Sequence, residues 1–138
     1  MKFVLKKRTP ESRLGHIRDI TIDGAQGTAR GTSRVAGHAE RRLENITVAN
    51  LHVKMLAENQ PDKRATDGLV FEAIDGLTLR SVEVDWDREK PEPQWGSALV
   101  LRDVSNLVLQ DFRGQAVHPE DSLPAVRRER VTERPAGR

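Results

Sequence analysis

The stretch DWDRE carries the side chains with the clearest chemical potential, because Asp85 and Asp87 flank Trp86. In a strand, residues two apart project from the same face, which would separate the two carboxylates by about 6–7 Å. Glycoside hydrolysis needs one acid to protonate the glycosidic oxygen and one carboxylate to activate water. Asp85 and Asp87 are therefore candidate catalytic residues, and Trp86 and Trp95 are candidates for stacking on a sugar ring.

The same stretch has a second interpretation. DWDRE leads into a charged, proline-bearing segment, residues 85–96, where paired acids beside Arg88 and Lys90 are commonly a solvated face. A tryptophan in such a place can instead cover the apolar side of the structure beneath it. Both alternatives stay open from the sequence.

Other kinds of site have little support. The histidines are scattered (His16, His38, His52 and His118) and lack the close spacing of a metal site, so we expect no metal and no cofactor. His52 stands between Leu51 and Val53 and is expected to face solvent. Cysteine is absent, and no nucleophile elbow or phosphate-binding loop occurs.

The elements that would position these residues come from a repeat. Four eight-residue segments share one frame: IRDITIDG from Ile17, LENITVAN from Leu43, IDGLTLRS from Ile74 and VSNLVLQD from Val104. Their first, fourth and sixth places are aliphatic, which is the alternation of a strand with one buried face. Their third place is occupied by residues that tolerate a left-handed backbone, namely Asp19, Asn45, Gly76 and Asn106. Each copy therefore predicts a tight corner followed by a strand.

The spacing of the copies, 26, 31 and 30 residues, indicates a solenoid in which each unit buries its apolar face on the next. The gaps contain no long apolar pattern of helical period. They contain further strand-like segments instead, LVFEA (residues 69–73) and ALVLR (residues 98–102), and a short strand is expected at residues 34–36. We therefore predict an all-β fold, a parallel β-helix of about four coils, with Ile20, Ile46, Leu77 and Leu107 stacked in one column.

Length and charge set the domain organisation. The 138 residues suffice for one domain, with coils over residues 1–116 and a cap with an arginine-rich, frayed tail over residues 117–138. The tail could act as an electrostatic arm, but no aromatic residue interleaves with its arginines, so nucleic acid is not the expected partner. No apolar run is long enough for a membrane span, and MKFVLKKRTP is too short in its apolar part for a signal peptide.

The segment from Phe3 to Phe112 resembles the C-terminal coils of bacterial proteins related to polygalacturonases, glycoside hydrolase family 28. The segments LENITVANLHV and SALVLRDVSNLVLQDF carry this resemblance. It implies a right-handed coil and a pectin-like polysaccharide as substrate. The family's Asn-x-Asp, Asp-Asp and Gly-His-Gly motifs have no match here, and Lys6 is the single candidate that corresponds to the family's substrate-binding lysine. The departures indicate a chain that is not active alone.

The ends of a solenoid need cover, because terminal coils expose apolar residues and unpaired strand edges. The segment Phe3–Val4–Leu5 begins a coil without a preceding amphipathic helix, so a homo-oligomer of two or three chains is expected. The predicted role is structural and self-assembling, with a polysaccharide as a further ligand. The alternative is a carbohydrate-active enzyme whose site forms across subunits, with Asp85, Asp87 and Lys6 as its first candidates.

Overall fold

The computed structural model describes residues 2–4, 18–38, 40–57, 67–87, 95–114 and 125–134. Throughout this part the chain is all β, with one mostly parallel sheet and no helix, as the alternating pattern predicted. The seven strands are β1 (Lys2–Val4), β2 (Arg18–Ala29), β3 (Ser33–Ala36), β4 (Leu43–Met55), β5 (Leu69–Trp86), β6 (Leu99–Gly114) and β7 (Val126–Glu133). Accordingly, no helix capable of crossing a membrane occurs among the described residues.

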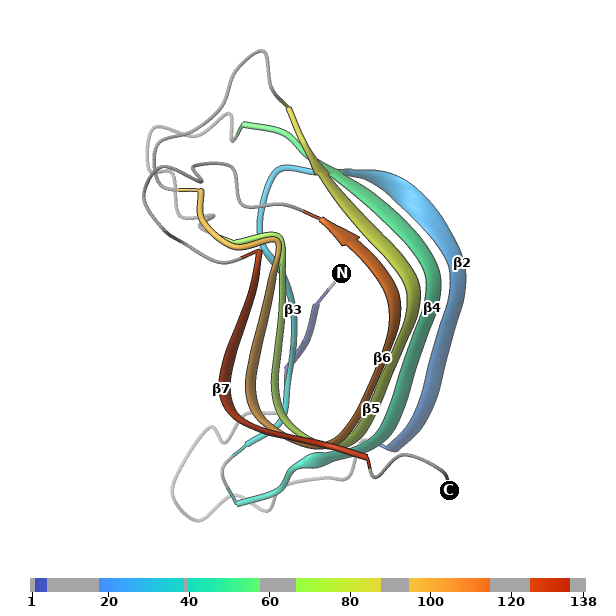
Figure 1. Ribbon diagram of the computed structural model, residues 1–138, viewed down its shortest axis with the longest axis vertical. Helices are drawn as coiled ribbons and strands as arrows, with labels where there is room; N and C mark the ends of the chain where they lie inside the picture. Colours follow the sequence, from blue (N-terminus) through green and yellow to red (C-terminus); the bar gives the residue numbers. More distant parts are fainter. Residues whose placement is uncertain are drawn as a thin grey trace.

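The strands pair in two parallel ladders that run in the same order. In the first ladder, β1 pairs with β3, and β3 pairs with the beginning of β5, followed by the beginnings of β6 and β7. In the second ladder, β2 pairs with β4, and β4 pairs with the remainder of β5, followed by the remainder of β6. Figure 1 shows the two ladders on opposite sides, with β2, β4, β5 and β6 curving around one side and β3 and β7 on the other.

The register confirms the predicted column of aliphatic residues. Ile20 lies opposite Ile46, and Ile46 lies opposite Leu77. Thr78 lies opposite Val108, which places Leu107 next in the same column. These pairs keep the 26-, 31- and 30-residue intervals of the sequence repeat, so the repeat and the ladder have the same period. The short strand expected at residues 34–36 is also present, as part of β3.

The predicted corners are present at the third place of each frame. Asp19, Asn45, Gly76 and Asn106 all have a left-handed backbone, with φ between 53° and 83°. The amides of this column also link neighbouring strands, because Asn45 Nδ2 donates to Asp19 Oδ1 at 2.7 Å and Asn106 Nδ2 donates to Asp75 Oδ1 at 2.8 Å. The second of these bonds, together with one from Ser105, lowers the pKa of Asp75.

Two further columns of left-handed residues were not predicted. One contains Gly24, Asn50, Ser81 and Asp111, and the other contains Ala73, Asp103 and Arg130. The second column is where β5, β6 and β7 bend from the first ladder into the second. LVFEA and ALVLR therefore do not form separate strands; they are largely the first parts of β5 and β6, which continue around the bend.

The side chains between the two ladders form one core that is mostly aliphatic. Inward-facing residues of the central strands, such as Val48, Leu79 and Leu101, are fully buried. The sequence has few aromatic residues, and leucine, isoleucine and valine accordingly make up most of this core. Hydrophobic burial of this kind is the main stabilising term.

Residues 117–138 were expected to form a cap and a frayed, arginine-rich tail, and the structure describes residues 125–134 of this segment. Residues 126–133 form β7, a paired strand whose Val126 and Val131 pack against the core. Arg130 donates to both carboxylate oxygens of Asp103 on β6, which lowers the pKa of Asp103 and raises that of Arg130. The Arg130–Asp103 ion pair thus links β7 to β6, and β7 covers the first part of β6 as a cap would.

Candidate functional site

The outer face of the second ladder carries a cluster of His52 on β4 with Glu83 and Asp85 on β5. Strand alternation produces this cluster, because Leu51 and Val53 point into the core and leave His52 between them to point outward. The same alternation buries Val82 and Val84 and directs Glu83 and Asp85 outward. The prediction that His52 faces solvent is confirmed.

The parallel register brings the three side chains together. His52 lies directly opposite Glu83, and Asp85 is two residues further along the same face. His52 Nε2 is 2.7 Å from Asp85 Oδ2, and His52 Nδ1 is 3.9 Å from Glu83 Oε2. The side chains are 47%, 40% and 51% exposed in the order His52, Glu83 and Asp85, so they are accessible from solvent without any rearrangement of the strands.

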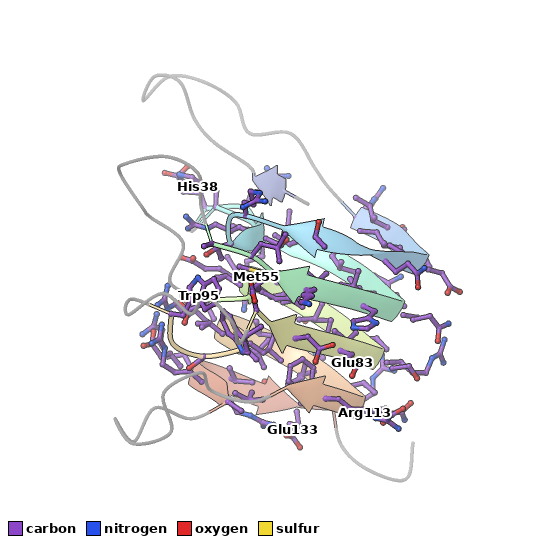
Figure 2. All side chains as sticks on the ribbon, turned by 90° about the horizontal axis from the view of Figure 1, so that it is seen from above. His38, Met55, Glu83, Trp95, Arg113 and Glu133 are labelled. Carbon is purple, nitrogen blue, oxygen red and sulfur yellow. The ribbon has the colours of Figure 1, made fainter. Side chains whose placement is uncertain are left out.

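A hollow continues this face toward β6. Its volume is about 200 Å³, and its lining includes Ser81, Glu83, Asp111 and Arg113. Arg113 lies opposite Glu83 in the register, and Figure 2 shows the two residues near one another on the outer side of the ladder. Arg113 Nε is 3.4 Å from Asp111 Oδ1, so its guanidinium is directed to that carboxylate.

The cluster combines one imidazole with two carboxylates, which are groups that bind divalent metal ions and transfer protons. One ligand atom from each residue can be chosen so that all three lie within 4.8 Å of one another. Among the residues that the structure describes, this is the one group of three or more histidine, aspartate or glutamate side chains close enough to share an ion. The spacing of the histidines in the sequence had predicted no metal site.

The three predicted catalytic residues, Asp85, Asp87 and Lys6, do not lie together in the described part of the structure. Asp85 lies in β5 with its carboxylate beside His52, whereas Asp87 follows the end of β5 and donates its backbone N–H to Met55 O at 2.8 Å. Lys6 lies outside the described residues. The catalytic role of these three residues stays a prediction.

The two tryptophans are in the core. Trp86 is 5% exposed and Trp95 is 1% exposed, and their ring centroids are 5.1 Å apart with the planes inclined at 40°. Figure 2 shows Trp95 among the strands on the side of Met55, which is also buried. Neither indole presents a face to a sugar ring, because each is covered by the protein. The alternative role, packing over the apolar side of the strands, is the one that this burial favours.

The proximity of His52 and Glu83 was not predicted, although their positions in the sequence repeat imply it. Both occupy the tenth place counted from the start of their repeat frames, Leu43 and Ile74. Residues at equal places lie opposite each other in a parallel ladder, so the frame implied this pair.

Comparison of the chain with protein-family models, curated proteins and solved structures found no match. The structure itself defines the protein as an all-β chain with a mostly parallel sheet and a histidine–carboxylate cluster on one outer face.

Proposed function

We propose that the chain is a right-handed parallel β-helix module with a structural, self-assembling role. Two ladders that advance in the same order at intervals of about 30 residues support the helical path. The right-handed sense follows from the resemblance to the closing coils of polygalacturonase-related proteins. It also agrees with the strong preference of parallel crossover connections for that hand.

The assembling role is supported by the partial exposure of apolar side chains on the first and last strands of the second ladder, β2 and β6. Ile46 is 2% exposed and Leu77 is fully buried, but Ile20, which holds the same place on β2, is only partly buried. At the other end, Leu109 and Phe112 are also only partly buried. Within the described residues, no strand pairs with the edge of β2 that faces away from β4, and beyond Leu107 β6 pairs with β5 on one edge and with no strand on the other.

The β2 end favours a second copy as the covering partner. The segment of β2 from Gly24 to Ala29 carries no charge, and an uncharged strand edge is a template for pairing with another chain. A hollow of about 160 Å³ opens there, and its apolar lining includes Ala25, Ala29, Leu51 and Val53. By contrast, β7 carries several arginines and glutamates, and such charges protect an edge strand from further pairing.

A closed dimer through β2 is the simplest assembly, since a twofold axis lets one edge cover the same edge of a partner. The polysaccharide that the resemblance implies as a ligand would have to bind through polar groups of the outer faces, because both tryptophans are buried.

Light scattering after size exclusion, over a range of protein concentrations, tests the assembly. The chain should form a discrete dimer, and Ile22→Lys on β2 should convert it to a monomer. Leu109→Lys is the matched control, because it places the same charge at the opposite end and should leave the dimer intact. A native chain that is monomeric or polydisperse at all concentrations overturns the proposal, and equal effects of the two variants overturn the choice of β2.

A further inference from the structure

We propose that His52, Glu83 and Asp85 bind one divalent transition-metal ion, with Zn²⁺ as the probe, on the outer face of the second ladder. This site goes beyond the assembling role, since it lies on the outer face of β4 and β5, whereas the proposed dimer forms through the edge of the neighbouring strand β2. It joins neighbouring strands, because His52 belongs to β4 and both carboxylates belong to β5.

The distances fit a small ion after side-chain rotation alone. Zinc binds histidine nitrogen and carboxylate oxygen at about 2.0–2.2 Å, which puts neighbouring ligand atoms of a tetrahedral site about 3.3 Å apart. One ligand atom from each of the three residues can be chosen so that all lie within 4.8 Å of one another, and His52 Nε2 is 2.7 Å from Asp85 Oδ2. The side chains are about half exposed and can rotate, whereas the paired strands hold the backbone.

The ligand types favour a transition metal over calcium or magnesium. Calcium and magnesium take oxygen ligands, usually six or more, whereas an imidazole nitrogen suits zinc, copper or nickel. Two carboxylates balance the charge of a divalent ion. Three protein ligands leave a fourth position for water, as in zinc sites that are open to exchange.

The positively charged side chains around the cluster do not prevent an ion from binding there. Arg113, which lies opposite Glu83, is directed to Asp111. Lys54 lies opposite Asp85 and two residues from His52 on the same strand. Replacing Lys54 by glutamine removes repulsion toward the ion, so Zn²⁺ should bind at least as tightly to that variant as to the native chain.

Calorimetric titration of the untagged full chain, stripped with a chelator, with Zn²⁺ tests the proposal. One ion per chain should bind, and each of His52→Gln, Glu83→Gln and Asp85→Asn should weaken binding about tenfold or more, since even changes to groups that only support metal ligands cost 10–100-fold. His38→Gln and Glu44→Gln are matched controls in described positions away from the cluster and should leave the affinity unchanged.

Thermal unfolding gives an independent readout, because an ion that links β4 to β5 in the folded state should raise the Tm. The rise should disappear in the three site variants, whose folding is checked by circular dichroism without metal. Absence of Zn²⁺ binding by the native chain, equal binding by site variants and controls, or tighter binding of Ca²⁺ than of Zn²⁺ overturns the proposal. The oligomeric state measured by light scattering reports on the assembly separately, so the two proposals can fail independently.

Discussion

The column of Ile20, Ile46, Leu77 and Leu107 predicts a gradient of stability from the middle of the stack to its β2 end. Leu77→Ala removes side-chain atoms from a fully buried position, whereas Ile20→Ala removes them from a partly buried one. The two substitutions delete similar groups at the same place of the repeat, so the difference between them isolates the effect of enclosure.

The magnitudes follow from burial. Leu77→Ala loses the transfer free energy of the deleted groups and leaves a cavity between two neighbouring strands, which together should cost about 3–4 kcal/mol. Ile20→Ala leaves no enclosed cavity and returns less apolar area to water, so about 1 kcal/mol is expected. Lys54→Ala, at an exposed position between the buried Val53 and Met55, should change stability by less than about 0.5 kcal/mol.

Urea unfolding followed by circular dichroism measures these differences as shifts of the midpoint at constant slope. The measurements belong at low protein concentration, because a partner that covers β2 would add to the cost at Ile20. A Leu77→Ala cost no larger than that of Ile20→Ala would refute the placement of this column between two buried neighbours.

Two further predictions concern the backbone and the carboxylates. Gly37→Ala should destabilise the chain more than Gly76→Ala in the same urea assay. A Cβ at Gly37 would lie 2.4 Å from Ala73 O, which is a steric clash. A Cβ at Gly76 would meet no atom closer than 3.5 Å, so this substitution incurs only the strain of a positive φ, about 1–2 kcal/mol. The lowered pKa of Asp75 means that its contribution to stability is fully present above the unfolded-state pKa of about 3.9 and is lost as pH falls through the lower folded value. Asp75→Asn should therefore reduce the loss of Tm between pH 6 and pH 2.5, and a variant with the same pH dependence as the native chain would contradict this assignment.

The parts of the fold that were predictable depend on side-chain chemistry that acts locally. Asn45 and Gly76 mark corners because amide-bearing residues and glycine tolerate a left-handed backbone, and the aliphatic places beside them mark the buried face. Ala73 and Arg130 adopt the same backbone without any such preference. Their conformation is imposed by strands that must turn from one ladder into the other, so it depends on pairing between distant segments.

The candidate site was predictable to a smaller extent. The pattern around Asp85 suggested a partner two residues away on the same strand, but the carboxylate contacts His52 from the neighbouring strand. That contact needs the register between repeats in addition to the alternation within one strand. The burial of Trp86 likewise follows from its inward place after Val84, which DWDRE alone does not fix.

The unequal intervals of the ladder have a consequence for how such a chain can change in length. Successive strands of the second ladder are offset by 26, 31 and 30 residues, yet their aliphatic places stay aligned. The connections therefore absorb differences of up to five residues without moving a single core side chain. Growth by duplication of one unit would add one level and leave those on either side unchanged, and insertions placed between units would alter the periphery without shifting the interior.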